Sequence, residues 1–360
     1  MSTPSLDIFQ QIFTLSLKSN VLSGALHSPV TGSAKHLARH LENDLNAFLN
    51  SDASGNFSGW RLVGAGVYQD TAQGSMVADN AIALFAPPLE NNLLKPNPNA
   101  PSYLLTIAGT NANSKVNVDI EEMGVATQEP LLSGNHNILI SSGNCIALNN
   151  ILSLLDDDSK FNAITGNTPV NLTITGHSLG GALTSILALY LKTAYPVMSI
   201  TTYPTASPST GNEDFVTAFA AAFPAIPDHH INQPYAVWNA NIYNDLDIVP
   251  QAWATGGPLQ LGNFEYIYHY EPVFREIVDG LVVHYTNEVD GHYRALLRAN
   301  TASFTGPRPT INPISNYQEL LSVALEEHVA AYINEFNISK YISPDNVAGF
   351  GITVLNELAF

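Results

Sequence analysis

The feature that most constrains this chain is a serine between glycines, at the junction of a strand-like run and an apolar helical run. Residues 171–181 read NLTITGHSLGG, and the helical pattern LGGALTSILALYLK begins at Leu179. A serine on so sharp a turn stands clear of the backbone, and side chains in place of Gly176 and Gly180 would collide with the neighbouring strand and helix. The backbone N–H of Leu179, at the helix N-terminus, would then face a developing oxyanion. The segment predicts Ser178 as a nucleophile, with an ordinary tight turn as the alternative.

Strand-like and helical runs alternate over most of the chain. The strand-like runs are 60–68, 80–87, 102–109, 170–175, 197–204, 235–243, 263–271 and 281–285. The helical runs are 36–50, 145–155, 179–192 and 213–223. This alternation predicts an α/β fold with a mainly parallel sheet flanked by helices. We expect one large domain over residues 1–360, with residues 1–55 as a helical extension packed on it, because the length is near the upper limit for a single core.

The charge balance excludes some classes of partner. Thirteen basic and 31 acidic residues give a formal net charge of −18. Nucleic acids and anionic membranes attract surfaces rich in Lys and Arg, so neither is expected as a partner. The single cysteine, Cys145, allows no intrachain disulfide and no Cys-based zinc site. The sequence contains no recognisable signal peptide and no transmembrane segment, so we expect a soluble protein, cytoplasmic by default or secreted by another route.

Candidate acids and bases follow the serine along the chain. Asp245 and Asp247 come directly after the strand-like run 235–243, and their spacing alone does not choose between them. A carboxylate at this place would hold the tautomer of an imidazole base. Four histidines come later: His269, His284, His292 and His328. The first two lie in strand-like runs and the last in a helical run, so the local pattern favours His292, which follows a glycine and begins a helical pattern.

A candidate oxyanion-hole donor lies upstream of the serine. The strand-like run 102–109 ends in Gly109, and Thr110 follows it. A hydroxyl residue just past a strand can direct both its N–H and its Oγ–H toward the end of a neighbouring strand, which suits an oxyanion hole. A plain glycine–threonine turn is the alternative.

Four segments between residues 60 and 340 resemble the class 3 (fungal-type) triacylglycerol lipases of the α/β-hydrolase superfamily, including their bacterial members. These segments are TGHSLGGALTSILAL, TYPTASPSTGNEDF, NDLDIVP and LLTIAGT. The resemblance implies an α/β-hydrolase fold and a triad of Ser178, Asp247 and His328. Asp247 is chosen because it directly precedes Ile-Val-Pro, and His328 because HVAAY is similar to the family's late helix. The resemblance therefore favours His328 over the locally favoured His292.

The resemblance also implies an activity. A lipase of this family hydrolyses triacylglycerols through an acyl-enzyme, with Thr110 and the Leu179 N–H as oxyanion-hole donors, and needs no metal ion or organic cofactor. The chain departs from the family at Ala108, where an arginine is usual, and the region 264–320 is longer than expected. A short-chain carboxylesterase, another acyl hydrolase and a non-enzymatic binding module are the alternatives. The oligomeric state cannot be predicted from these residues.

The family further implies a lid that uncovers the site at a lipid–water interface. Residues 112–133 lie between the oxyanion strand and the next helix, and they mix apolar with charged side chains. Gly124 and Gly134 are the expected hinges. An ordinary capping helix or loop is the alternative for this segment.

Overall fold

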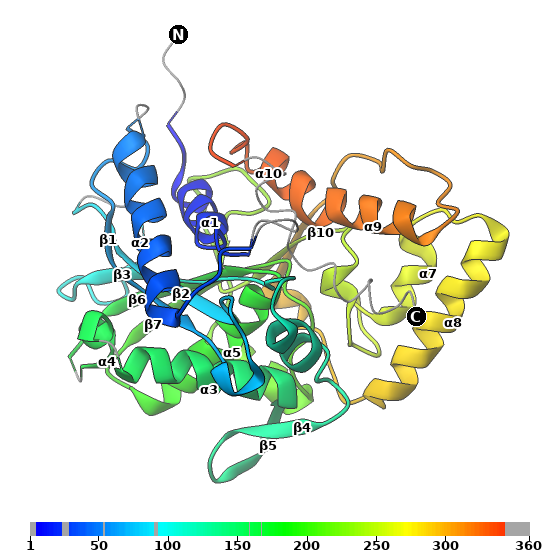
Figure 1. Cartoon of the computed structure of the whole chain (residues 1–360), viewed down its shortest axis with the longest axis horizontal. Helices are drawn as coiled ribbons and strands as arrows, with labels where there is room; N and C mark the ends of the chain where they lie inside the picture. Colours follow the sequence, from blue (N-terminus) through cyan, green and yellow to red (C-terminus); the bar gives the residue numbers. More distant parts are fainter. Residues whose placement is uncertain are drawn as a thin grey trace.

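The computed structural model describes residues 5–23, 29–52, 55–89, 93–157, 159–166 and 168–342, apart from the side chains of Glu122 and Asp157. A seven-stranded sheet lies at the centre, in the order β1-β2-β3-β6-β7-β10-β11 (Figure 1). β3, β6, β7, β10 and β11 are parallel, whereas β1 and β2 are antiparallel additions at one edge. This confirms the α/β fold expected from the alternating pattern. The strands of this sheet are β1 (Arg61–Tyr68), β2 (Asn80–Ala86), β3 (Ser102–Ile107), β6 (Asn171–His177), β7 (Ser199–Thr205), β10 (Asn241–Asn244) and β11 (Thr301–Phe304).

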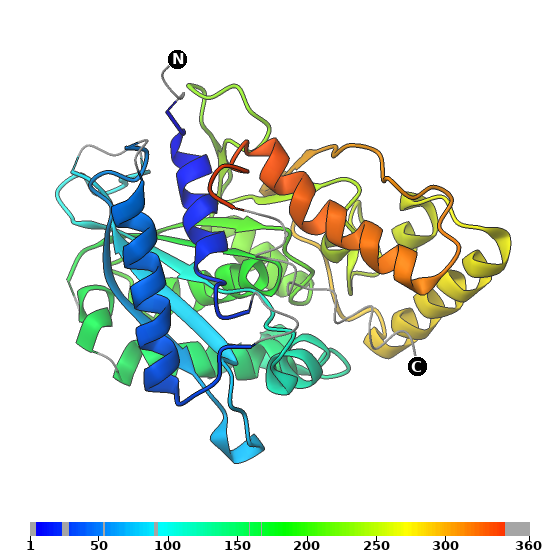
Figure 2. The ribbon, with the colours of Figure 1, turned by 45° about the horizontal axis from the view of Figure 1, so that its top comes forward.

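Helices cover both faces of the sheet, and each face has its own hydrophobic core. α1 (Ile8–Lys18), α2 (Ala34–Ser51) and α10 (Ala331–Glu335) pack on one face. α3 (Ser142–Asp157), α5 (Leu179–Ala194) and α6 (Glu213–Ala222) pack on the other. Figure 2 shows α1, α2 and the helical run that ends in α10 across the same side of the sheet. How the chain divides into domains, with residues 1–55 as an extension, stays a prediction.

Two of the predicted helical runs, 36–50 and 213–223, form helices whose regularly spaced apolar residues are buried. Leu37, Leu41 and Leu45 of α2 are buried in the first core. The three phenylalanines of the run 213–223 are buried in the second core, where neighbouring rings contact each other: Phe215, Phe219 and Phe223. Apolar residues that recur every three or four positions lie on one face of a helix, which explains why the pattern predicted these two helices.

The predictions of strands at 263–271 and 281–285 are wrong. The first run holds a short helix, α7 (Phe264–Ile267), and the second lies inside a long helix, α8 (Pro272–Val289). Five buried residues recur along α8 at helical spacing: Phe274, Val278, Val282, Tyr285 and Val289. The five residues LVVHY are too few to show this period, so their β-branched content pointed to a strand.

A helical group lies beside the sheet, at the right in Figure 1. It contains α7, α8 and α9 (Tyr317–Leu325), which share a third core.

The expected strand 235–243 is divided into β9 (Val237–Trp238) and β10, because Asn239 takes a left-handed conformation with φ 59°. None of the helices in the described ranges is long and apolar enough to cross a membrane. The remaining strands and short helix are β4 (Gln128–Leu132), β5 (Asn135–Ser141), β8 (Ile226–Pro227) and α4 (Asn162–Thr165).

Candidate active site

Ser178 lies on a sharp turn between β6 and α5. Its backbone has φ 60° and ψ −128°, a conformation that residues other than glycine seldom adopt. The glycines on either side are needed for space. A Cβ added to Gly176 would lie 2.2 Å from the carbonyl oxygen of Gly180, and a Cβ added to Gly180 would lie 2.4 Å from the carbonyl oxygen of Ile107. The turn therefore has the strained, closely packed geometry of a nucleophile elbow.

Asp247 follows β10, and its carboxylate is fully buried. Its Oδ2 accepts hydrogen bonds from His328 Nδ1 at 2.8 Å and from the Tyr332 hydroxyl at 2.9 Å, and its Oδ1 accepts from the Val249 N–H at 2.9 Å. Asp245 instead lies at the surface, where it accepts a hydrogen bond from Thr305. The structure thus brings Asp247, and not Asp245, against a histidine.

His328 lies in a π-helical turn, η7 (Glu326–Ala330), between α9 and α10. For an imidazole on a late helix to reach the serine, a helix break near 326–327 would be the expected arrangement, and the structure has no such break. The chain stays helical from 317 to 335 and widens by one π turn at the histidine. Such π turns inside α-helices occur often at functional sites. The widened turn brings a fully buried imidazole to Asp247 without interrupting the helix.

Three polar side-chain atoms of the expected site are buried and have no hydrogen-bond partner: Ser178 Oγ, His328 Nε2 and Thr110 Oγ1. The expected hydrogen bond between Ser178 and His328 is therefore not formed, although the centroid of the His328 ring lies 4.7 Å from that of His177, the residue before the serine, with the two rings tilted by 33°. In proteins without substrate, such hydrogen bonds are often long and tighten only when substrate binds. Buried polar atoms are rarely left unpaired, and a bound ligand is one way in which such atoms are paired.

The other three candidate bases lie elsewhere. The side chain of His292 is 45% exposed, and its nearest carboxylate is Asp290 at 4.0 Å. The residues after His292 form no helix up to the short 3₁₀ turn at 298–300, so the helical pattern expected there is wrong. His284 pairs with Glu288 on the exposed side of α8, and His269 contacts Asn312. None of these three hydrogen-bonds to Asp247.

Two buried residues that the sequence analysis missed support the Asp247–His328 pair. The Tyr332 hydroxyl donates to Asp247 and accepts from the Asn244 N–H at 3.0 Å. His177 Nε2 lies 2.9 Å from the carbonyl oxygen of His328, which can only accept a hydrogen bond. Burial lowers the pKa of His177 well below its ordinary value, so this ring is neutral and holds the backbone of His328 through its Nε2–H. Tyr332 carried a signal, because it follows His328 by four residues and shares its helix face.

Glu327 is a further buried carboxylate beside the pair. Its Oε2 accepts from Asn244 Nδ2 at 2.7 Å, and burial raises its pKa to about 7. The residue was not considered in the sequence analysis, because a glutamate in a helical run gives no sign of burial.

Thr110 follows β3 and is fully buried. β3 and β6 are parallel neighbours in which Ile107 is paired with Gly176, so the turn after β3 and the elbow after β6 leave the same edge of the sheet. Leu179 is the first residue of α5, and its N–H points from the helix N-terminus. Thr110 and Leu179 thus lie on adjacent turns beside Ser178.

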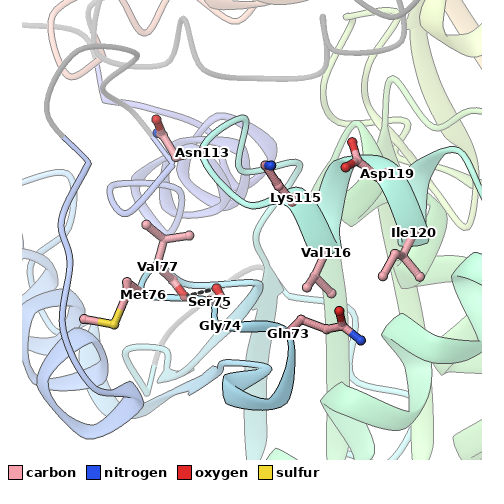
Figure 3. Close-up of a pocket in the computed structure, with 10 residues that line it drawn as sticks. All are labelled: Gln73, Gly74, Ser75, Met76, Val77, Asn113, Lys115, Val116, Asp119 and Ile120. Carbon is pink, nitrogen blue, oxygen red and sulfur yellow. Dashed lines mark hydrogen bonds between the residues drawn. The ribbon is translucent and has the colours of Figure 1, made fainter.

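The segment that the sequence predicted as a lid contains the short π-helix η2 (Val116–Glu122) and the strand β4. A hollow of about 400 Å³ separates η2 from the loop 73–77 (Figure 3). Gly124 lies against Gly143, where an added Cβ would lie 2.9 Å from the Gly143 nitrogen. Gly134 has φ 87° in the turn between β4 and β5, so both glycines have packing or turn roles in this conformation. That the segment moves as a lid stays a prediction.

Comparisons with known proteins agree with this geometry. Residues 104–256 match the family model described as lipase (class 3). The structure resembles the M37 lipase with a TM-score of 0.65 at 22% identity, over 97% of this chain and 98% of that one. The Lip2 lipase from Yarrowia lipolytica matches at a TM-score of 0.42 and 16% identity, over 70% of this chain and 77% of that one. No curated protein matches the chain. The likeness to the M37 lipase supports the α/β-hydrolase fold.

Proposed function

We propose that the protein hydrolyses carboxylic esters, with triacylglycerols as its substrates, because residues 104–256 match the family model described as lipase (class 3). Ser178, His328 and Asp247 form the catalytic triad in this proposal. One juxtaposition supports it: a buried Asp247–His328 pair at 2.8 Å beside an elbow whose serine hydroxyl has no hydrogen-bond partner.

The reaction proceeds through an acyl-enzyme. Ser178 Oγ attacks the ester carbonyl while His328 Nε2 takes its proton, and the alcohol leaves as His328 returns that proton. Water then attacks the acyl-enzyme by the same route and releases the fatty acid. Asp247 accepts from His328 Nδ1, which fixes the tautomer with a free Nε2 and stabilises the imidazolium.

The oxyanion of each tetrahedral intermediate is held by donors on two turns. The Thr110 hydroxyl and the Leu179 N–H are the donors in this proposal. Removal of one such donor typically lowers kcat by about 100-fold to 1,000-fold. Thr110 Oγ1 is buried and unpaired, so its hydrogen is available to the substrate oxygen.

The proposal is tested with pure protein and a fluorophosphonate that labels activated serines. We expect labelling and ester hydrolysis by the wild type and neither by Ser178→Ala, since alanine fits the turn and removes only the hydroxyl. Equal turnover by the variant would refute the assignment of Ser178. An unlabelled wild type would indicate a binding module. Hydrolysis of dissolved short-chain esters without hydrolysis of emulsified triacylglycerols would indicate a carboxylesterase.

A further inference from the structure

Two asparagines from separate elements hold the backbone on either side of Thr110. Asn20, just after α1, accepts a hydrogen bond from the Gly109 N–H through its Oδ1. Asn117, in η2, accepts from the Asn111 N–H at 2.6 Å through its Oδ1. Both side chains are 1% exposed. The residue between the two held amides is the candidate oxyanion-hole donor.

Each asparagine is itself fixed by a second hydrogen bond. Asn20 Nδ2 donates to the Ser16 carbonyl oxygen at 2.9 Å, so the end of α1 sets the direction of its Oδ1. Asn117 Nδ2 donates to Glu121 at 2.6 Å. The Glu121 carboxylate also accepts from Asn80 of β2 at 2.8 Å and from Asn150 of α3 at 2.9 Å. A buried amide with both ends bonded has little rotational freedom, so the backbone that it holds is fixed as well.

The two contacts restrict a turn whose exact shape matters. Oxyanion donors act only when they lie about 3 Å from the position of the developing charge. A displacement of about 1 Å in a catalytic geometry can lower the rate by about 100-fold. A third hydrogen bond also fixes the turn: Asn111 Nδ2 donates to the Ala78 carbonyl oxygen at 2.7 Å. These hydrogen bonds therefore fix the backbone on both sides of Thr110 and leave the Thr110 hydroxyl unpaired.

We propose that Asn20 and Asn117 are positioning residues that keep the turn 109–111 in the shape that directs Thr110 at the oxyanion. The inference rests on the proposed function, in which Thr110 is an oxyanion donor. Asn20 lies outside residues 104–256, the part of the chain that matches the class 3 lipase model, so in this proposal the N-terminal helical part of the chain takes part in setting the geometry of the reaction centre.

The test measures kcat and KM for Asn20→Ala and Asn117→Ala on a dissolved ester. We expect each variant to lower kcat by about 10-fold with little change in KM, because the turn loses one of its holds but keeps its donor. Each substitution is then combined with Thr110→Val, which removes the hydroxyl. If the asparagines act through Thr110, the loss in the double variant is smaller than the product of the two single losses.

Ser19→Ala is the matched control. Ser19 is buried at the same end of α1, and its hydroxyl contacts Thr106 Oγ1 at 2.7 Å, within β3 and ahead of the turn. Its replacement should lower the melting temperature and leave kcat unchanged. Asn20→Asp keeps an acceptor oxygen for the Gly109 N–H, so we expect it to retain more of kcat than Asn20→Ala even if both melt at a similar temperature. If Asn20→Ala does not fold, Asn117→Ala carries the test alone.

The outcomes separate this inference from the proposed function. A wild type without esterase activity would overturn both. An active wild type in which Thr110→Val lowers kcat but the asparagine variants do not would overturn only the positioning role. Losses that multiply fully with Thr110→Val, or an equal loss of kcat in Ser19→Ala, would show a general structural role and would also overturn it.

Discussion

Gly180→Ala tests how closely the elbow at Ser178 and the turn 109–111 are packed. An added Cβ would lie 2.4 Å from the Ile107 carbonyl oxygen and 2.9 Å from that of Ala108. The first distance is 1.0 Å shorter than the 3.4 Å at which ordinary contact begins. Both oxygens belong to the backbone at the end of β3, so neither can rotate away. To accommodate the Cβ, α5 and the end of β3 must therefore separate by about 1 Å. A displacement of about 1 Å in a catalytic geometry can lower the rate by about 100-fold.

The expected result is a loss in two measurements. Overpacking of this kind typically lowers the free energy of unfolding by about 1–3 kcal/mol. The shift separates the nucleophile from the turn that carries Thr110, so kcat on a dissolved ester should fall by about 100-fold. Thermal unfolding and steady-state kinetics on the purified variant measure the two effects independently.

Gly280→Ala is the matched control. Gly280 lies in α8, and an added Cβ there meets nothing within 4 Å. The same substitution should therefore raise the free energy of unfolding by about 0.5–1 kcal/mol, since alanine has the higher helix propensity, and leave kcat unchanged. If Gly180→Ala kept the wild-type kcat and melting temperature, the close approach of α5 to β3 would not be a constraint on the site, and the reasoning from the elbow would be wrong.

Three further predictions follow from buried groups and from the expected lid. Tyr332→Phe removes a hydrogen bond to Asp247 and leaves the Asn244 N–H unpaired, so it should lower the free energy of unfolding by about 2–4 kcal/mol in a denaturant titration; an unchanged stability would contradict it. Burial raises the pKa of Glu121 from 4.5 to about 8, so the stability that its bound proton contributes is complete below pH 4.5 and is lost as the pH rises through about 8. The melting temperature should therefore decline as the pH rises through about 8, and Glu121→Gln should flatten that decline. An unaltered slope in the variant would show that Glu121 is not the group responsible for it. Activity on a partly soluble triacylglycerol should rise sharply at its solubility limit, and a deletion within 116–125 should remove the rise; smooth saturation by the intact protein would argue against a lid.

The central sheet and its covering helices could be predicted because their signals are local. Leu37, Leu41 and Leu45 repeat every four residues, and α2 buries all three. The elbow was predictable for a similar reason, since the glycines around Ser178 are required by close contacts with the adjoining strand and helix. Short windows were less informative: the run 281–285 is apolar in a way that both a strand and a buried helix face allow.

The network around the turn 109–111 could not be predicted, because several of its contacts join distant parts of the chain. The hydrogen bond from Gly109 to Asn20 spans 89 residues, and that from Asn150 to Glu121 spans 29. Asparagine is common in turns and helix caps, so neither residue type nor neighbourhood indicated a buried role for these side chains. Two of the three amide partners of the buried Glu121, Asn80 and Asn150, are likewise brought to it only by the fold, whereas the third, Asn117, is a near neighbour on the same short helix.

The choice between His292 and His328 shows where a local rule fails. The rule that functional side chains lie on loops favoured His292, but this loop side chain is half-exposed, and among the described residues its imidazole is paired only with Asp290, at 4.0 Å. The buried alternative needs a helix: His328 and Tyr332 are four residues apart, share one helix face, and both donate to the same oxygen of Asp247. A loop would not hold two donors in that relation without further contacts. The helical pattern of HVAAY, which counted against His328 on local grounds, is therefore the property that brings the imidazole and the phenol to one carboxylate.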